Sequence, residues 1–477
     1  MGQVSLEGSL AWRRSQSMRV QEPSADGDPG GQPESAMANL ALLGGPRAVP
    51  EPSTDLFRWS DVTPDHEAAI LDVLHRGAMS GTDVTRQFEK EYAAWQGQRH
   101  AIAFNTGTAA IHAAMWAIGL CTGDEVIAQS ITYWASILPA MSLGAVPVLV
   151  DIDPHTLCID PAKIEARIGP RTRAIVVTHN MGHPTDMDPV MEIARRHGLK
   201  VIEDVSHAHG GRYRGRKLGT IGDVAAFSCM SGKSFPIGEG GLLTTDDHTI
   251  HERALAFAHY ERYDEGITDH ELVPFRGLPL GGVKYRMHQM SSALGRVQLR
   301  AYDVRVDGIQ AAMNEFWDLL EGIPGIHAHR VDPSSGSTMG GWYNPKGLYN
   351  AEELGGLSVT RFAAAVRAEG IDCRPGLPYK PLHLHPLFHS ADVYGHGRPT
   401  RIAFAERDVR ERRGDLPVAE AVGTRTFGVP WFRRYDRDAI ARYAAAFRKV
   451  VAGHHELLAD DPGNAPGLAD WRDEPMM

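Results

Sequence analysis

Residues 227–241 read Phe-Ser-Cys-Met-Ser-Gly-Lys-Ser-Phe-Pro-Ile-Gly-Glu-Gly-Gly, and they place Lys233 among small residues. Most lysines are solvated surface charges, so this one gains meaning only from two earlier features. Asp204, the last residue of an apolar strand pattern, lies 29 residues before Lys233. Gly107, where another strand pattern turns into a helix pattern, lies 126 residues before it. An amine, a carboxylate and such a turn along an α/β chain indicate one shared ligand site.

This combination favours pyridoxal phosphate (PLP) as the ligand. A lysine amine forms an imine with the aldehyde of PLP, a carboxylate holds the pyridinium proton, and helix N-terminal amides hold the phosphate. Thr108 belongs to the same turn as Gly107, and Ser228 offers a hydroxyl five residues before Lys233. Taken singly, each feature also fits an ordinary role: a capped helix, an acidic cap on a loop, or a serine at a strand end.

Between residues 100 and 245, short apolar β-rich runs alternate with helical patterns. Near-continuous apolar strands separated by helices predict a large, mostly parallel mixed sheet with helices on both faces. The expected strands are 101–104, 125–129, 146–150, 174–178, 200–203, 224–228 and 241–245, and the expected helices are 108–118, 135–143, 161–168 and 189–197. Ligands of such sheets bind at the carboxyl ends of the strands, where Asp204 and Ser228 fall.

The rest of the chain predicts four parts in all: a disordered N-terminal extension (1–36), a large PLP-binding α/β domain (37–290), a smaller C-terminal α+β domain (291–453) and a loose tail (454–477). The extension is rich in Gly, Ser, Pro, Gln and Asp. A long amphipathic helix over 290–320 is expected to connect the two domains. Another helix, Asp436–Val451, is expected to close the smaller one, with Asp436 as its N-cap.

The composition excludes several classes of protein. Lys plus Arg is 49 and Asp plus Glu is 59, so the 477-residue chain carries 49 − 59 = −10 charges. This acidic balance argues against nucleic acid or an anionic membrane as the main partner. The four cysteines are far apart and form no C-x-x-C pair, which predicts a cytoplasmic protein without disulfides. No apolar run is long enough to span a bilayer.

Two further motifs allow more than one interpretation. Residues 206–211 read Ser-His-Ala-His-Gly-Gly, and two histidines at this spacing can ligate a metal. A third ligand does not emerge from the sequence, so we expect no metal and interpret His207 as a contact to the 3-hydroxyl side of PLP. Tyr133 follows a strand, and its ring either stacks on the pyridine face or packs in the core.

The joint pattern resembles the sugar aminotransferases of the DegT/DnrJ/StrS family, which are fold-type I PLP enzymes. The segments that carry the resemblance are 42–46, 105–108, 182–188, 203–210, 219–228, Lys233, 238–241, 284–287 and 381–383. Together they cover about residues 40 to 452, and their order and spacing are more specific than any single one. The resemblance implies transfer of an amino group from L-glutamate or L-glutamine to a keto sugar or keto cyclitol in secondary-metabolite or amino-sugar biosynthesis.

The resemblance also implies roles for individual residues. Lys233 is implied as the Schiff-base lysine and proton shuttle, and Asp204 as the pyridinium partner. The implied contacts to the cofactor are Gly107, Thr108 and Ser228 at the phosphate, Tyr133 as the stacking ring, and His207. A homodimer with shared active sites is implied, in which the segment around Lys284 reaches the partner's phosphate.

The sequence departs from the family pattern at Lys284, where many relatives have Asn, and in the segment 229–234. A lysine reaches a phosphate as a point charge, or it is a solvated surface residue. The segments 259–282 and 332–357, the latter with Trp342 and Tyr343, are candidate substrate-specificity loops. Cyclitol-type members are nearest in wording, because they share Gly-His-Pro-x-Asp-Met and His-x-His-Gly.

Three alternatives to aminotransfer stay open at this stage. Some similar PLP proteins are dehydratases in which a histidine replaces the Schiff-base lysine, so Lys233 argues for transamination. Others aromatise a cyclic precursor to an aminobenzoate. A PLP-binding regulatory protein without turnover is the third alternative, and retention of both Lys233 and Asp204 argues against it.

Overall fold

The computed structural model describes residues 40–58, 62–265 and 267–468 of the chain. The predicted N-terminal extension, 1–36, lies outside the described residues. Of the predicted tail, the described part begins with a short helix, α14 (His454–Leu457). Among the described residues, no helix combines the length and the apolar character that a membrane crossing requires.

The largest element is a seven-stranded sheet with the strand order β1-β9-β8-β5-β4-β2-β3. Its strands are β1 (His100–Phe104), β2 (Glu125–Gln129), β3 (Val146–Val150), β4 (Thr172–Thr178), β5 (Lys200–Asp204), β8 (Val224–Ser228) and β9 (Gly241–Thr245). Strands β3, β2, β4, β5 and β8 run parallel, whereas β9 pairs antiparallel with both β8 and β1. The predicted mostly parallel mixed sheet is confirmed.

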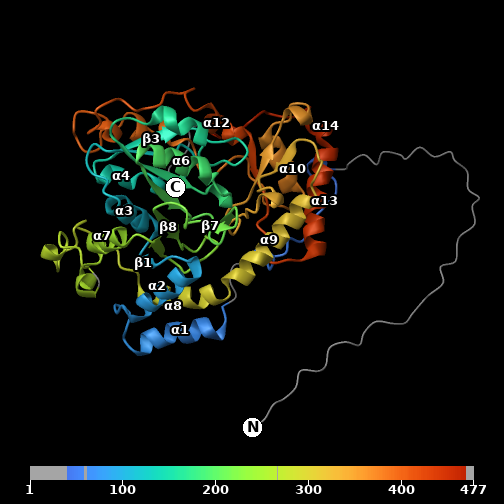
Figure 1. The fold of residues 1–477 in the computed structure, drawn as a ribbon. Coiled ribbons are helices and arrows are strands. Elements are labelled where there is room, and N and C mark those ends of the chain that lie inside the picture. Colours follow the sequence, from blue (N-terminus) through green and yellow to red (C-terminus); the bar gives the residue numbers. More distant parts are fainter. Residues whose placement is uncertain (1–39, 59–61, 266, 469–477) are drawn as a thin grey trace, which may run out of the picture. The chain divides into compact units, whose positions relative to one another are not determined.

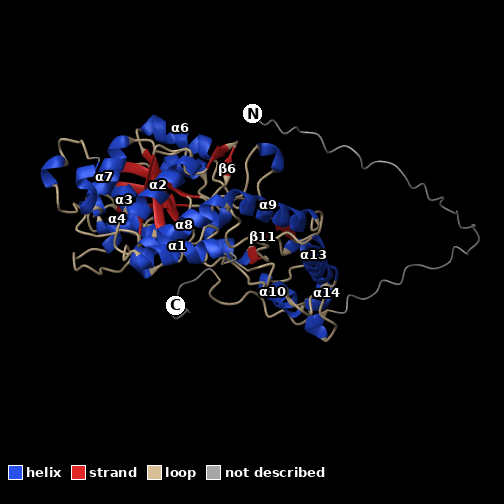
Figure 2. Cartoon of the chain, turned by 90° about the horizontal axis from the view of Figure 1, so that it is seen from below, coloured by secondary structure: helices blue, strands red, loops and turns tan. Residues whose placement is uncertain are grey.

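Helices cover both faces of this sheet (Figures 1 and 2). Alternate residues of β1 show the two faces, because Ile102 and Phe104 join one buried apolar cluster while Ala101 and Ala103 join the other. The first cluster takes in α3 (Gly107–Ala117), α4 (Pro139–Ser142), α7 (His248–Ala258) and α12 (Pro417–Ala421). The second takes in α2 (Asp83–Gln96) and α6 (Met187–His197), while α1 (Pro64–His75) packs on α8 (Gln289–Arg300) farther out.

A second, three-stranded antiparallel sheet has the order β10 (Ile326–Ala328), β11 (Lys346–Tyr349) and β12 (Thr426–Gly428). A third apolar cluster joins it to α9 (Tyr302–Asp318), α10 (Val359–Ala368) and α13 (Arg437–Ala452). The side chain of Asp436 accepts from the backbone N–H of Ala439 over 3.0 Å, as the predicted N-cap should. Shorter elements are α5 (Pro161–Ile164), α11 (Pro386–His389), β6 (Arg212–Tyr213) and β7 (Arg216–Lys217).

Two predicted helices differ from the structure. The segment 135–143 forms a 3-10 turn, Trp134–Ser136, followed by α4. Pro139 has no backbone N–H to donate within a continuous helix, so it stands at the start of a new one. The predicted helix 290–320 is two helices, α8 and α9, which Ala301 separates with φ −109° and ψ 1°. The break precedes the buried Tyr302, whose hydroxyl donates to the carbonyl of His209 and to Ser234 Oγ. These bonds tie α9 to the carboxyl ends of the large sheet.

Candidate active site

The strand order brings the predicted polar residues to one edge of the large sheet. Strand β5 lies between β4 and β8, with Asp204 opposite Thr178 on one side and opposite Ala226 on the other. Ser228 ends β8, two residues beyond Ala226. Since these strands are parallel, their carboxyl ends form a common edge, and Asp204 lies at its centre.

Asp204 is a buried carboxylate that few groups satisfy. Its side chain is 4% exposed, Ser136 Oγ donates to Oδ2 over 2.6 Å, and the backbone N–H of Ser206 donates to Oδ1 over 3.0 Å. Ser136 Oγ also lies 2.8 Å from Thr132 Oγ1, so the serine is itself held in place. A carboxylate has about four acceptor sites, and burial without a cation is costly, so the arrangement suits a positively charged donor such as a protonated pyridine nitrogen.

Lys233 lies in the loop between β8 and β9 and is 6% exposed. Its backbone N–H donates to the carbonyl of Met230 over 2.8 Å, and the neighbouring Ser231 N–H donates to Gly238, which closes the loop. Burial lowers the pKa of the Lys233 amine from 10.5 to about 8, and the charge of Asp204 opposes this shift. About a tenth of the amine is therefore neutral, and hence nucleophilic, at pH 7, far more than for a lysine with the ordinary pKa.

A lowered lysine pKa does not by itself mark the site. Lys346 in β11 is 5% exposed, and burial lowers its pKa to about 8 as well. The carboxylate among the groups that act on Lys346 is Asp372, and the residue stands on the second sheet, away from the common strand edge. Lys233 differs because Asp204 acts on it and because its loop begins at Ser228.

The N-terminus of α3 forms a cradle of the kind that phosphate requires. Thr106 caps the helix by accepting from the Ala109 N–H over 3.0 Å. The amides of Gly107 and Thr108 lie in the first turn of the helix, where an N–H group has no carbonyl partner within the helix. A Cβ on Gly107 would lie 2.6 Å from the Ser228 Cβ, and one on Gly241 would lie 2.3 Å from the Thr106 carbonyl oxygen. Only glycine permits this close approach, which holds the helix N-terminus against the ends of β8 and β9. These residues fit the phosphate of PLP.

His207 and His209 belong to different surroundings. The His207 ring stacks on Tyr343 with centroids 4.6 Å apart, and its Nε2 lies 3.2 Å from Tyr379 Oη. Burial lowers the pKa of His207 well below its usual range, so the ring is neutral. His209 instead packs on Phe235, and its Nε2 lies 2.9 Å from the Ser228 carbonyl oxygen. Only His207 therefore belongs to the group of side chains around Lys233.

Two tyrosines complete this group, Tyr343 and Tyr379. The sequence places Tyr343 only within a candidate specificity loop and gives no signal for Tyr379. The Nζ of Lys233 lies 4.0 Å from the centroid of the Tyr343 ring, and the two phenols are hydrogen bonded to each other. Tyr133 is 42% exposed, and its ring centroid lies 5.9 Å from that of Tyr379. Tyr133 thus reaches the group through Tyr379, at its rim.

The segment 340–344 that delivers Tyr343 has a strained backbone. Trp342 and Asn344 have φ of 53° and 51°, a region that costs a non-glycine residue roughly 1–3 kcal/mol. A Cβ on Gly340 would lie 2.1 Å from the Ala208 carbonyl oxygen, and one on Gly341 would lie 2.3 Å from the Ser234 side chain. The segment is therefore wedged between the residues that follow His207 and Lys233. Two consecutive glycines before an aromatic pair are the signal in the sequence that marks it.

Lys284 is exposed, and its Nζ lies 5.8 Å from the centroid of the Tyr260 ring. The residues after it run beside the end of β1, since Arg286 bridges to Phe104 and the Asn105 N–H donates to the Tyr285 carbonyl over 2.7 Å. The segment thus passes the start of the phosphate cradle while the Lys284 side chain faces outward.

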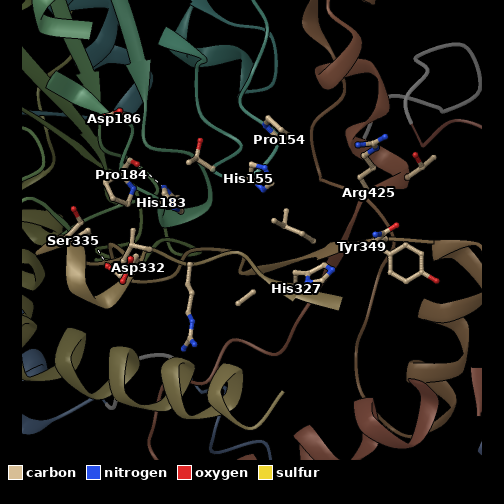
Figure 3. Close-up of a pocket in the computed structure, with 18 of the residues that line it drawn as sticks. Pro154, His155, His183, Pro184, Asp186, His327, Asp332, Ser335, Tyr349 and Arg425 are labelled. Atoms are coloured by element: carbon tan, nitrogen blue, oxygen red, sulfur yellow. Dashed lines mark hydrogen bonds between the residues drawn. The ribbon is translucent and has the colours of Figure 1, made fainter. Parts of the chain in front are cut away.

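Two cavities of the described structure lie at different distances from this group of side chains. A hollow of about 610 Å³ is lined by Gly232, Tyr343 and Trp431 and so adjoins Lys233. A larger cleft, of about 980 Å³, lies between the loops that follow β3 and β4 and the second sheet (Figure 3), with His155, Asp186, His327 and Arg425 among its walls. Its described lining includes neither Lys233 nor Asp204, so the larger cleft is separate from the group described above.

Comparisons with known proteins agree with this geometry. The model of the DegT/DnrJ/EryC1/StrS aminotransferase family matches residues 61–448. A relative from Streptoalloteichus tenebrarius, named putative L-glutamine:3-amino-2,3-dideoxy-scyllo-inosose aminotransferase, is 33% identical over 88% of this chain and 94% of its own. A GDP-perosamine synthase from Caulobacter vibrioides is 36% identical over 76% of this chain and 89% of its own. The crystal structure of an aminotransferase from Psychrobacter cryohalolentis superposes with a TM-score of 0.71 at 28% identity, covering 83% of this chain and 99% of the other.

The pH dependence of PLP uptake tests the surroundings of Lys233. Because its pKa is lowered to about 8, the neutral fraction of the amine rises as the pH increases through about 8. We expect the rate at which cofactor-free protein captures PLP, followed by absorbance in rapid mixing, to rise with a midpoint near that pH. A midpoint near 10.5, the ordinary lysine value, or an unchanged profile in Lys233→Ala, would contradict the assignment.

Proposed function

Because the chain belongs to the DegT/DnrJ/EryC1/StrS aminotransferase family, we propose that it moves the amino group of L-glutamine or L-glutamate to a keto cyclitol or, as the second candidate, to a keto sugar. Aminotransfer with PLP is the activity of the family. The observation that carries the proposal for this chain is the buried, lowered-pKa amine of Lys233 beside the buried carboxylate of Asp204.

Bound PLP supplies an electron sink and carries the amino group between the two substrates. In our proposal Lys233 Nζ anchors the cofactor and then takes a proton from the donor Cα as a neutral amine. The Lys233 amine becomes an ammonium when it takes this proton, and it would give the proton back later in the reaction. Its position over the Tyr343 ring supports this role, because a cation above an aromatic face is stabilised without being fixed by an ion pair.

Asp204 is proposed to keep the pyridine nitrogen protonated. Ser136 and the Ser206 N–H hold the carboxylate in one orientation, so its free acceptor positions face the ligand without reorganisation. His207 is proposed to contact the side of the cofactor that bears the 3-hydroxyl, and its interaction with Tyr379 fixes its ring. Because His207 is neutral, it adds no charge that would compete with the pyridinium.

We propose that the phosphate binds Gly107, Thr108 and Ser228 in one subunit and Lys284 of the other subunit of a homodimer. The close contacts among Gly107, Ser228 and Gly241 support the first part. The outward direction of Lys284, next to the start of the cradle, supports the second, because an exposed cation there is available to a neighbouring site.

Three named relatives at 32–33% identity transfer from L-glutamine to inosose compounds, which favours a cyclitol as the acceptor. The side chains around Lys233 suit a polyhydroxylated ring. The phenols of Tyr133, Tyr343 and Tyr379 donate and accept hydrogen bonds, and their ring faces pack on the C–H faces of a sugar or cyclitol. Retention of Lys233 argues against a dehydratase.

An acceptor screen tests the proposed function. Purified protein with PLP and L-glutamine is incubated with free keto cyclitols and, separately, with nucleotide-linked keto sugars, and products are identified by mass spectrometry. We expect an aminated cyclitol from the wild type and none from Lys233→Ala. An aminated nucleotide sugar alone selects the second candidate, and a dehydrated product without nitrogen would overturn aminotransfer to either acceptor.

Two graded variants test the role of Asp204. Asp204→Asn removes the charge that keeps the ring protonated, and we expect retained PLP with a turnover rate lowered on the order of a thousandfold. Ser136→Ala keeps the charge and removes one hydrogen bond, and we expect a loss of only about tenfold. Steady-state rates at saturating substrate measure both. Equal rates for Asp204→Asn and wild type would leave Asp204 as a structural cap.

Subunit mixing tests whether Lys284 acts across the dimer. A heterodimer of Lys284→Ala and Lys233→Ala subunits has one site with both defects and one intact site if Lys284 serves the partner. At limiting PLP the mixture should regain activity that each homodimer lacks. The advantage of the wild type over Lys284→Ala in PLP retention should shrink at high salt, because an exposed charge pair is screened. If subunits exchange but activity does not recover, Lys284 serves its own subunit or the solvent.

A further inference from the structure

A group of three histidines lies at one edge of the large sheet, apart from the Lys233 site. His100 is the first residue of β1, and His248 and His251 stand three positions apart on the first turn of α7, so they share one face of that helix. Each offers a ring nitrogen, and the three nitrogens lie within 4.8 Å of one another. Among the described residues this is the only group of three or more His, Cys, Asp or Glu side chains with ligand atoms so close together.

The three rings pack on one another. The centroids of His100 and His251 are 4.2 Å apart with the rings nearly parallel, and that of His248 is 5.3 Å from His100. The Nδ1 of His251 is buried and has no hydrogen-bond partner in the described part of the chain. A buried polar atom without a partner is uncommon, because it loses its hydration without compensation. A ligand bound at this place would give the atom a partner.

The charged groups around the cluster are of both signs. Asp246, Asp247 and Arg99 act on His100, and Arg262 acts on His251. Arg99 lies 3.9 Å from Asp246 and Arg262 lies 2.8 Å from Glu89, so both arginines are paired with carboxylates.

A buried carboxylate, that of Glu252, lies beside His248 as the orienting partner of a metal-binding histidine does. His248 Nε2 lies 3.1 Å from Glu252 Oε1, one helical turn further along α7. Glu252 is 2% exposed and accepts from the backbone N–H groups of Thr268 and Asp269 over 2.6 and 3.0 Å. A buried carboxylate that accepts from one ring nitrogen orients the imidazole and leaves its other nitrogen for a metal ion.

We propose that His100, His248 and His251 bind one divalent transition-metal ion, with zinc as the ion that best suits them. Neutral imidazole is a preferred ligand of zinc, whereas calcium and magnesium prefer oxygen ligands. Tetrahedral coordination with Zn–N bonds of about 2.05 Å places the ligand nitrogens about 3.3 Å apart. The rings therefore rotate to close the present spacing of up to 4.8 Å, which the 54% exposed side chain of His248 permits. Three histidines leave the fourth position to water.

The site joins the start of β1 to two consecutive segments far along the chain, α7 and the loop that follows it. His100 begins the strand that leads into the phosphate cradle at residues 105–108, and α7 carries the other two ligands. Through Glu252, the ion is also connected to Thr268 and Asp269 in the candidate specificity loop 259–282. A bound ion thus holds the loop, α7 and the start of β1 together, at a distance from the reacting groups.

The test is a zinc titration of the untagged, PLP-loaded full chain by calorimetry, with zinc chloride as the probe. We expect one saturable ion per chain in the wild type and affinity lowered more than about a hundredfold in His248→Gln, since loss of a direct ligand exceeds the 10–100-fold effect of an outer partner. His270→Gln is the matched control, because its side chain is 94% exposed in the same loop and should leave binding unchanged. Cobalt chloride should give a visible absorption band in the wild type and the control only.

A second measurement keeps the test decisive if a variant folds poorly. Excess zinc should raise the melting temperature of the wild type and of His270→Gln but not that of His248→Gln, because a ligand that binds only the folded state stabilises it. His248 is largely exposed, so His248→Gln is expected to fold. The proposal is overturned if His248→Gln binds zinc as tightly as the wild type, or if the wild type shows only weak binding that does not saturate.

Discussion

The buried carboxylate of Asp204 is the constraint on which the rest of this site depends. At 4% exposure it loses most of its hydration, and among the described residues its hydrogen bonds are with Ser136 and the Ser206 N–H. Such a charge is tolerated in a folded protein only where positive charge comes to it. The order of β8, β5 and β4 puts the Asp204 carboxylate at the centre of the strand edge. Its negative charge acts on the Lys233 amine and raises the pKa of that amine. The same need for a cation makes a protonated pyridine ring a favourable ligand at this position.

The site uses residues from both sheets of the molecule. Asp204, Ser228 and Lys233 come from the edge of the large sheet, whereas Tyr343 arrives on a strained segment that directly precedes β11 of the second sheet. The contacts of Gly340 with Ala208 and of Gly341 with Ser234 hold that segment between the two loops. Strain of this kind persists only where the surroundings fix it, and here it fixes the ring that covers Lys233. A shift of the second sheet would therefore move the wall of the site together with it.

The sequence predicted the frame of the fold better than the surroundings of the site. Strands 125–129, 146–150, 224–228 and 241–245 have the predicted bounds, because each has an apolar centre in a short β-rich run between turn residues. The predicted helix 290–320 was wrong as a single element, since the break at Ala301 depends on where Tyr302 is bonded and not on local preference. Tyr343 and Tyr379 meet Lys233 from more than 100 positions away, and His100 meets His248 and His251 in the same way. Contacts between distant segments leave no periodic pattern in a sequence.

In the proposed function Lys233, and no other lysine, anchors the cofactor. The chain offers a real competitor, because Lys346 is equally buried and its pKa is also lowered to about 8. Reduction of the PLP-loaded protein with borohydride fixes the cofactor to its lysine, and mass spectrometry of the peptides then locates it. We expect the added mass on the peptide that contains Lys233 and none on the peptide that contains Lys346. Label on Lys346, or on neither peptide, would contradict it.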